Sequence, residues 1–394
     1  MDRKKMKQLC QFFYDELTGN TLPFWIDHAV DSRYGGFVTY LDRRGEPLST
    51  DKPMWVHGRI TWLFSRLFNV LEKRQEWLDL ARHGMEFLLR HGFDTDGRMF
   101  YLVTRDGQPL RKRRYLYTES FGVIGLAEYA RASGDGESLD RARSLMDLLL
   151  KLHNTPGALE PKVNPRVRQS RTHAMSMVIV STLQVLRAAD PENETKYDDL
   201  IDREIEGLFE YFVKPEKKAL FETVGMQGEL LDSPEGRCLN PGHAIETAWF
   251  ILEEAKRRKD RALMEKTLPL IEWNLERGWD SRHGGIFYFL DSEGKQPEPL
   301  EWDMKLWWVH NEAIYATLLA YSLTGQHSYL EWFDRVFEWS EEHFPDREHG
   351  EWFGYLHYDG SVALDFKGNL WKGPYHLPRQ QLNCHLLLKS MLDA

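Results

Sequence analysis

The chain has 394 residues, of which 42% are hydrophobic and 13% aromatic, and its formal net charge is -10 at pH 7. A phosphate backbone or an anionic membrane calls for a concentrated basic face, so we expect neither nucleic acid nor membrane as a partner. The short basic run from Arg111 to Arg114 is interpreted as solvated surface. The N-terminus lacks an apolar signal segment, and no run approaches the roughly 18 to 20 apolar residues of a membrane span. We therefore expect a cytoplasmic protein.

The three cysteines, Cys10, Cys238 and Cys384, lie far apart and form no CxxC motif. Disulfide frameworks and thiolate zinc sites need cysteines at characteristic spacings. The sequence therefore predicts reduced thiols.

Hydrophobic periodicity predicts twelve helices. They cover residues 4–28, 54–72, 76–91, 117–133, 137–152, 172–189, 195–213, 242–257, 261–276, 306–323, 328–343 and 376–392. Short strands, bounded by Gly and Asp turn signals, are expected between helix pairs. These strands lie within residues 37–48, 99–103, 220–224, 229–231 and 286–290.

One unit occurs three times, with turns that begin at Asp31, Asp280 and Asp346 and lead through a short strand pair into a helix. Such repeats decide the fold. Six helix pairs predict an all-α fold, an (α/α)6 barrel that forms a single catalytic domain over residues 1–394, with the first helix beside the last. Each strand pair lies between an outer helix and the next inner helix. The short β-hairpins should therefore gather at one end, where we place the active site.

Polar residues mark the start of each inner helix. They are His57 and Arg59; Tyr117 and Glu119; His173 and Met175; His243 and Glu246; Trp308, His310 and Glu312; and His376 and Arg379. Helix positions that face a core usually carry aliphatic side chains. A single buried histidine is more often structural than catalytic, but six matching positions on one ring predict a common site.

The motifs give little support to metal or phosphate chemistry. His243 and Glu246 share a helix face, but the chain has no HExxH motif and no second copy of this pair, so we expect no metal. A carboxylate beside a histidine more often fixes its tautomer and raises its basicity. The chain also lacks a GxxxxGK[ST] loop, a GxGxxG turn after a strand and a GxSxG elbow.

At these residues the sequence resembles the N-acylglucosamine 2-epimerase family, called renin-binding proteins in mammals. The resemblance covers nearly the whole chain and is most specific in residues 240–246, 304–313, 350–355 and 372–379. It implies an (α/α)6 barrel, which the wider superfamily of cellobiose 2-epimerases and aldose–ketose isomerases shares.

Several positions indicate which branch of the superfamily this sequence resembles more. His310 and the segment His376-Leu377-Pro378-Arg379 resemble the N-acyl branch, whereas Ile245-Glu246-Thr247 resembles the disaccharide branch. Pro374 stands where animal members carry a cysteine, so a thiol there is not essential in this chain. His57 stands where N-acyl members carry glutamine.

The resemblance implies interconversion of N-acetyl-D-glucosamine and N-acetyl-D-mannosamine, with His243 and His376 as the acid/base groups. Inversion at C2 of the ring-opened sugar removes a proton from one face and returns one to the other, which suits two bases. Histidine titrates near pH 6.5 and serves either role. Glu246 and Glu312 would tune the imidazoles, and Arg59 would stabilise the enolate oxygen. The residues expected to contact the sugar also include His57, Tyr117, Glu119, Met175, Trp308, His310 and Arg379.

The resemblance further implies that no cofactor is required, allows ATP as an activator and indicates a homodimer. Three alternatives stay open at this point. One is an isomerase or epimerase of an unsubstituted sugar such as mannose or cellobiose. Another is a glycoside hydrolase using two carboxylates, such as Glu119 and Glu246. The third is a non-catalytic binding protein.

Overall fold

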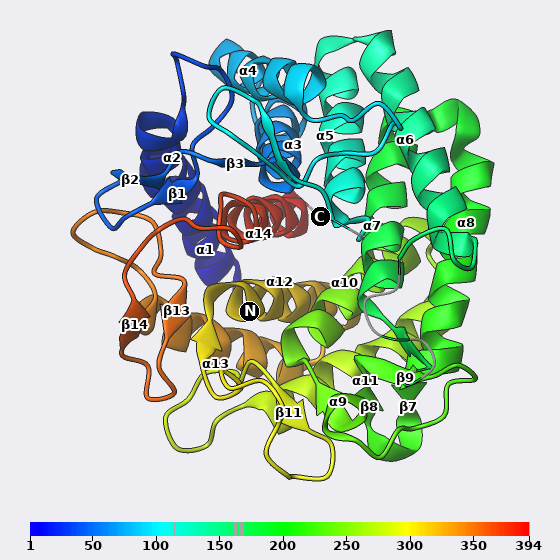
Figure 1. The fold of residues 1–394 in the computed structure, drawn as a ribbon. Helices are drawn as coiled ribbons and strands as arrows, with labels where there is room; N and C mark the ends of the chain where they lie inside the picture. Colours follow the sequence, from blue (N-terminus) through cyan, green and yellow to red (C-terminus); the bar gives the residue numbers. More distant parts are fainter. Residues whose placement is uncertain (114, 161–163, 165–166, 168, 394) are drawn as a thin grey trace.

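The computed structural model describes residues 1–113, 115–160, 164, 167 and 169–393. Six helices form an inner ring (Figure 1). They are α3 (Met54–Val70), α5 (Tyr117–Ser133), α7 (Ala174–Ala189), α10 (Pro241–Arg258), α12 (Trp307–Thr324) and α14 (His376–Asp393). Each packs against the next, and α14 packs against α3, so the ring closes. Helices in such a position are surrounded by protein, and every residue of α12 from Trp307 to Ala320 is buried.

An outer layer of amphipathic helices covers the ring. It consists of α1 (Arg3–Glu16), α2 (Leu22–Ala29), α4 (Gln75–His91), α6 (Gly136–Asn154), α8 (Glu194–Gly207), α11 (Arg261–Gly278) and α13 (His327–His343). In α4, for example, Trp77, Ala81, Met85 and Leu88 recur at helical spacing and are buried. A π-helical turn, Leu17–Thr21, joins α1 to α2, and another, Leu208–Phe212, extends α8. The outer layer therefore supplies one partner for each inner helix.

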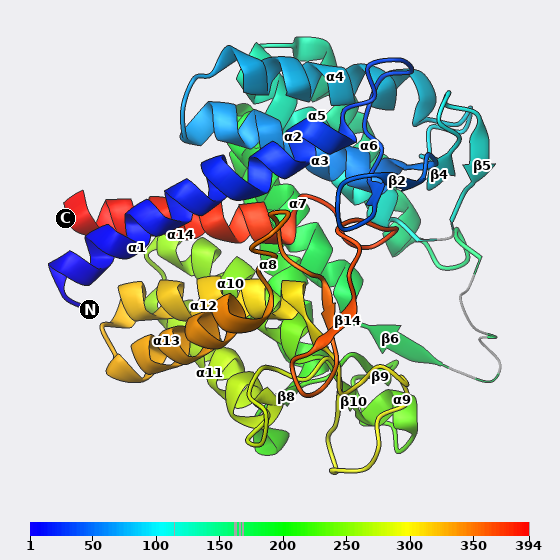
Figure 2. The ribbon, with the colours of Figure 1, turned by 90° about the vertical axis from the view of Figure 1, so that its left-hand side faces the viewer.

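The first helix packs beside the last, as predicted. α1 lies along α14 in Figure 2, and the two are in contact. This contact completes six helical hairpins and confirms the (α/α)6 barrel. None of the described helices is both long and apolar enough to cross a membrane.

Short antiparallel strands gather at the end of the barrel away from the termini, again as predicted (Figure 2). They are β1 (Tyr40–Leu41), β2 (Pro47–Ser49), β3 (Lys52–Pro53), β4 (Leu102–Val103), β5 (Pro109–Arg111), β6 (Ser170–Thr172), β7 (Val213–Lys214), β8 (Ala219–Leu220), β9 (Thr223–Gly225), β10 (Cys238–Leu239), β11 (Leu290–Asp291), β12 (Lys305–Leu306), β13 (Tyr355–Leu356) and β14 (Val362–Leu364). A short helix, α9 (Pro234–Arg237), and 3-10 turns at Pro191–Asn193 and Pro215–Lys217 complete the elements.

The strands differ from the sequence prediction in extent and in pairing. Within residues 286–290 only Leu290 belongs to a strand. Residues 229–231 form no strand, and β9 pairs instead with β6 from the preceding unit. β3 with β4, β10 with β11 and β12 with β13 likewise join neighbouring units. The strands therefore tie adjacent helical hairpins together at the same end at which the inner helices begin.

The three repeated turns share a buried ion pair. In each turn the side chain of the leading aspartate accepts backbone N–H groups, as Asp31 does from Arg33 and Tyr34. A buried lysine then approaches the same carboxylate. The Nζ to Oδ2 distances are 2.9 Å for Lys52 and Asp31, 3.1 Å for Lys305 and Asp280, and 3.0 Å for Lys367 and Asp346. This pair is the physical basis of the repeat that the sequence shows.

Candidate active site

One polar cluster surrounds His376, the first residue of α14. Its Nδ1 donates to Oε1 of Glu312 on α12 at 2.6 Å. Arg379 donates to the same oxygen at 2.6 Å and to Oε1 of Glu246 on α10 at 2.5 Å. Trp249 Nε1 donates to the second oxygen of Glu312 at 2.7 Å. Three inner helices therefore fix the orientation of this imidazole, and its Nε2 receives no hydrogen bond from the described residues.

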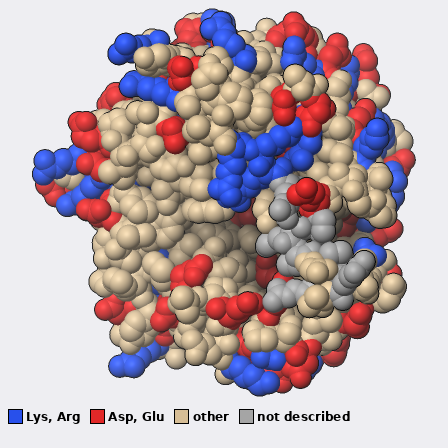
Figure 3. All heavy atoms as spheres, viewed as in Figure 1, with Lys and Arg blue, Asp and Glu red and all other residues tan. Residues whose placement is uncertain are grey.

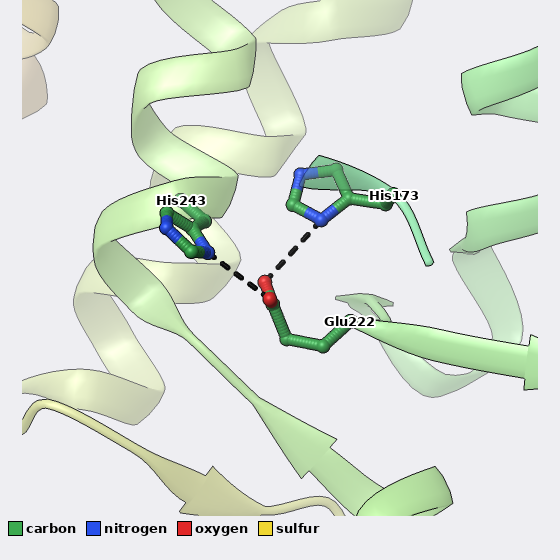
Figure 4. A group of neighbouring side chains, drawn as sticks. All are labelled: His173, Glu222 and His243. Atoms are coloured by element: carbon green, nitrogen blue, oxygen red, sulfur yellow. Dashed lines mark hydrogen bonds and ion pairs between the residues drawn. The ribbon is translucent and has the colours of Figure 1, made fainter. Parts of the chain in front are cut away.

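A second cluster surrounds His243 in the first turn of α10 (Figure 4). The Asn240 side chain caps this helix by accepting from the His243 backbone N–H at 3.0 Å. His243 Nδ1 lies 3.0 Å from Oε2 of Glu222, in the loop between β8 and β9. His173 Nδ1, just before α7, lies 3.3 Å from the other oxygen of the same carboxylate. Glu222 thus stands between two histidines.

Trp308 contacts a histidine of each cluster. Its ring centroid lies 5.2 Å from that of His243 and 5.7 Å from that of His376. The packing requires glycine at position 242, because a Cβ there would lie 2.6 Å from the Trp308 ring. The two imidazoles therefore both lie beside one aromatic ring, at the end of the barrel where the inner helices begin.

The surroundings shift the two pKa values in opposite directions. Burial would lower the pKa of His243, but the charges of Glu222, Glu246 and Glu312 outweigh it, so the pKa is raised. Burial and the neighbouring Arg379 hold the pKa of His376 well below its usual range. A pair of titratable groups pushed apart in this way is typical of an acid and a base with assigned roles.

Arg59 on α3 offers a cation that makes no hydrogen bond or ion pair with the residues that the structure describes. Its guanidinium lies 4.0 Å from the ring centroid of Phe121, 4.3 Å from that of Trp55 and 4.4 Å from that of Tyr375. The residue is only 8% exposed, and its Nε has no hydrogen-bond partner among the described residues. Burial lowers its pKa to about 10, which still leaves it charged. Its N–H groups are therefore available to an oxygen of a bound ligand.

His57 and His310 are not substrate contacts, which corrects the sequence prediction. The Phe37 N–H donates to Nε2 of His57 at 3.0 Å, and Nδ1 of His57 donates to the Pro53 carbonyl at 3.0 Å. His310 makes the equivalent bonds, from the Ile286 N–H at 2.9 Å and to the Leu306 carbonyl at 2.8 Å. Both rings are fully buried, and burial lowers each pKa to about 3. These histidines hold the repeated turns.

Glu119 has the same structural role, so its expected place in the substrate site is also wrong. Its Oε1 accepts from the Met99 N–H at 3.2 Å and from Arg98 Nε at 2.9 Å. Met99 forms a β-bridge with Phe93, as Phe37 does with Val30 and Ile286 with Trp279. The side chain of Glu119 is completely buried, and burial raises its pKa. The carboxylate therefore fixes a turn.

Tyr117 and Met175 lie at the starts of α5 and α7, and both are half-buried. Burial, with a contribution from the charge of Glu222, raises the pKa of Tyr117 to about 12. Tyr117 is thus within electrostatic range of the His243 cluster. Contact of either side chain with a sugar stays a prediction.

Sequence reasoning missed Glu222, Trp249 and Tyr375. Trp249 orients Glu312, and the Tyr375 hydroxyl accepts from Arg379 at 3.1 Å. Tyr375 belongs to the motif at residues 372–379 and could have been found there, whereas Glu222 lies in a predicted strand pair with no local signal. Its contact with His243 depends entirely on the tertiary fold.

Figure 3 looks onto the strand end, where Lys and Arg side chains gather beside a hollow at the centre of the face. The basic run lies at this end of the barrel. Lys112 pairs with Asp94 at 2.8 Å and Asp96 at 2.6 Å, and Arg113 lies 4.0 Å from the Tyr101 ring centroid. Arg114 lies outside the described residues. Lys112 is thus neutralised by two carboxylates rather than left free for an anionic partner.

Comparison with known proteins gives a consistent result. A sequence model of the family described as N-acylglucosamine 2-epimerase (GlcNAc 2-epimerase) matches residues 35–378. The N-acylglucosamine 2-epimerase of Bos taurus is 36% identical over 94% of this chain and 89% of its own length. The cellobiose 2-epimerase of Dictyoglomus turgidum is 28% identical over 96% and 98%. The solved structure of cellobiose 2-epimerase from Spirochaeta thermophila is 25% identical, covers 99% of both chains and superposes with a TM-score of 0.85. This chain belongs to the N-acylglucosamine 2-epimerase family.

Proposed function

We propose that this protein is an isomerase that interconverts N-acetyl-D-glucosamine and N-acetyl-D-mannosamine by inverting C2 of the ring-opened sugar. The observation that carries the proposal is the pair His243 and His376, which both lie beside Trp308 and have pKa values displaced in opposite directions. The choice of an N-acyl sugar is supported by relatives named N-acylglucosamine 2-epimerase, which are 34 to 36% identical over 94 to 95% of this chain.

In one direction His376 acts as the base. It is neutral, and its Nδ1–H is bound to Glu312, so the lone pair of Nε2 takes the C2 proton alpha to the C1 aldehyde. The electron pair of the C2–H bond forms the C1–C2 double bond, the C1 carbonyl pair moves to the oxygen, and a planar enolate results. His243, protonated beside Glu222, then delivers a proton from Nε2 to the opposite face of C2. In the reverse direction the two histidines exchange roles.

Arg59 stabilises the intermediate. The negative charge develops on the C1 oxygen after proton removal, and a preorganised cation in a dry site is worth more there than in water. Arg59 is fixed among three aromatic rings, and its N–H groups are available to a ligand. Arg379, in contrast, is bound by Glu246 and Glu312. We therefore assign the oxygen-binding role to Arg59 and the orientation of His376 to Arg379.

The reaction is redox-neutral and exchanges its proton with water, so the proposal needs no cofactor. ATP as an activator, a cytoplasmic location and a homodimer are further parts of the proposal, supported by the family resemblance. Light scattering at several protein concentrations tests the oligomeric state, and turnover with and without ATP tests activation.

An epimerase or isomerase of unsubstituted sugars is the second candidate. It is favoured by the 28% identity to a cellobiose 2-epimerase and by the segment Ile245-Glu246-Thr247. The hydrolase alternative loses support, because Glu119 is fully buried on the Met99 backbone and cannot face a scissile bond together with Glu246. A binding protein without catalysis leaves the opposed pKa values of His243 and His376 unexplained.

Proton NMR of the purified protein with N-acetylmannosamine in D2O tests the proposal. We expect N-acetylglucosamine to appear with deuterium at C2, because the second histidine returns a solvent-derived proton. Conversion of mannose or cellobiose in the same buffer, without conversion of N-acetylmannosamine, would move the protein to another branch. The same spectra recorded with ATP test the activator.

A further inference from the structure

We propose that His173, Glu222 and His243 form a binding site for one divalent transition-metal ion of the zinc type, and that occupation of this site inhibits the enzyme. One ligand atom from each of these three residues lies within 4.8 Å of the other two, and Figure 4 shows both imidazoles turned toward the carboxylate. The inhibition rests on the function proposed above, whereas the binding does not.

The hydrogen bonds fix the tautomer of His173. The Thr247 hydroxyl donates to the His243 carbonyl at 2.8 Å, so its oxygen accepts from Nε2–H of His173 at 3.0 Å. A neutral His173 with hydrogen on Nε2 has only a lone pair on Nδ1. That lone pair faces Oε1 of Glu222 at 3.3 Å. Two electron-rich atoms therefore lie opposite each other.

Neither of these two atoms has a hydrogen-bond partner among the described residues, although both are buried. His173 is completely buried, so its nitrogen is shielded from solvent. A buried polar atom without a partner is costly, and native structures usually satisfy it with an ion or water. A cation between Nδ1 of His173 and the carboxylate would satisfy both atoms at once.

The donor set and spacing suit zinc. Bonds of about 2.0 to 2.1 Å in a tetrahedral site place neighbouring donors roughly 3.3 to 3.5 Å apart. Nδ1 of His173 lies 3.3 Å from Oε1 of Glu222, and Nδ1 of His243 lies 3.0 Å from Oε2 of the same carboxylate. Two imidazoles and one carboxylate leave a fourth position for water, as in catalytic zinc sites. Small side-chain rotations would complete the coordination.

The second histidine and carboxylate group, which contains Glu246, Glu312 and His376, provides an internal contrast. It is equally compact, but Arg379 already lies within 2.6 Å of both carboxylates. No lysine or arginine among the described residues pairs with Glu222. A metal ion is therefore expected at the His173 cluster and not at the His376 cluster.

A metal on Nδ1 of His243 would stop proton transfer. The ring would keep its hydrogen on Nε2 and would have no lone pair left to take a proton from C2. His243 has 29% of its side chain exposed, so an ion can reach it from the open side of the site. The bound ion would thus inhibit without any change of fold.

Zinc binding to chelator-treated protein, measured by isothermal titration calorimetry, tests the site directly. We expect one Zn²⁺ per chain, and at least about tenfold weaker binding in His173→Gln, because loss of one ligand removes a coordinate bond. His327→Gln, at the exposed start of α13, is the matched control and should bind as the unmodified protein does. Absence of stoichiometric binding, or equal affinity in His173→Gln, would overturn the proposal.

Inhibition is then measured for each variant as turnover with zinc divided by its own turnover without zinc. We expect the zinc concentration for half inhibition to rise at least about tenfold in His173→Gln, in parallel with its weaker binding. Binding that depends on His173 in a protein that turns over no sugar would keep the site and remove the proposed function. Sugar turnover without zinc binding would remove only the site.

Discussion

His57 and His310 bind backbone groups, whereas His243 and His376 bind carboxylates, although all four stand in the first turn of an inner helix. His57 and His310 are the fourth residues of α3 and α12, while His243 and His376 are the third and first of theirs. Each residue along a helix turns the side chain by about 100°. A shift of one to three residues therefore decides which neighbours an imidazole meets.

The neighbours in turn decide whether the imidazole can work. Backbone groups bind both nitrogens of His57 and of His310, and burial lowers each pKa to about 3, so both rings stay neutral near pH 7. A carboxylate binds one nitrogen of His243 and of His376 and leaves Nε2 open toward the site. The same residue type thus holds a turn in one pair and, in the proposed mechanism, carries a proton in the other.

Replacing His243 or His376, the proposed proton carriers, should have the largest effect on the reaction rate. His243→Asn and His376→Asn should each lower the epimerisation rate by roughly 10² to 10⁴-fold, the usual contribution of a general acid or base. Each variant should still exchange the C2 proton of one epimer, because the remaining histidine faces only one side of C2. Deuterium incorporation from each sugar separately checks this asymmetry. Equal exchange of both epimers in either variant would contradict the two-base scheme.

Arg59 and Arg379 differ in a similar way, because only Arg379 is bound by carboxylates. Replacing Arg59 should have the next largest effect on turnover. Arg59→Met should lower turnover by roughly 10² to 10³-fold, since the charge on the C1 oxygen loses its partner. Arg335→Met is the matched control, because Arg335 also lies over aromatic rings, those of Trp332 and Trp279, but on outer helix α13. Initial rates at saturating sugar measure both variants. Unchanged turnover in Arg59→Met would remove this residue from the mechanism.

Replacing His57, which holds a turn, should lower the stability of the protein and leave its turnover almost unchanged. His57→Ala leaves the Phe37 N–H and the Pro53 carbonyl without partners and opens a cavity, so the free energy of unfolding should fall by about 2 to 4 kcal/mol. Turnover per folded molecule should stay within about twofold of that of the unmodified protein. A difference of that size is close to the error of a single kinetic comparison. Thermal unfolding and kcat of the folded fraction give the two readouts. A stable variant with lost turnover would assign His57 to the substrate site after all.

The smallest change in free energy is expected at Glu222, the carboxylate bound to Nδ1 of His243. Glu222→Gln removes the charge that raises the pKa of His243, so that pKa falls. Activity that needs protonated His243 is present below this pKa and lost as the pH rises through it, and the high-pH limb of the rate profile should therefore move to lower pH. The maximal rate should fall on the order of tenfold. Glu293→Gln, an exposed carboxylate paired with Lys217, should leave the profile in place.

The sequence predicted the barrel because period and repeat are local properties. Turns at Asp31, Asp280 and Asp346 and six helix pairs were enough to place the strands at one end and the inner helix starts beside them. The prediction for residues 229–231 was wrong, because strand pairing across units is a tertiary event. β9 finds its partner in β6, more than 50 residues earlier.

Within the site, the sequence placed His243, Glu246, Glu312, His376 and Arg379 on one ring, and the structure brings them together around Trp308. Residue type alone could not distinguish the histidines that bind backbone groups from those proposed to transfer protons. A signal was nevertheless present, since a Gly-Gly turn precedes both braced helices, at residues 35–36 and 284–285. A Cβ on Gly36 would lie 2.7 Å from Nε2 of His57, so the glycine and the histidine are fitted to each other.

The contact between α1 and α14 ties the beginning of the chain to its end. Lys5 pairs with Asp334 on α13 at 2.7 Å, and Arg3 donates to the Leu392 carbonyl at 2.9 Å. During synthesis α14 leaves the ribosome after the other five inner helices, and it carries His376 as well as the surface that α1 covers. The nascent chain therefore holds α1 without this partner until α14 has been made. Closure of the ring thus coincides with the arrival of His376 at the site.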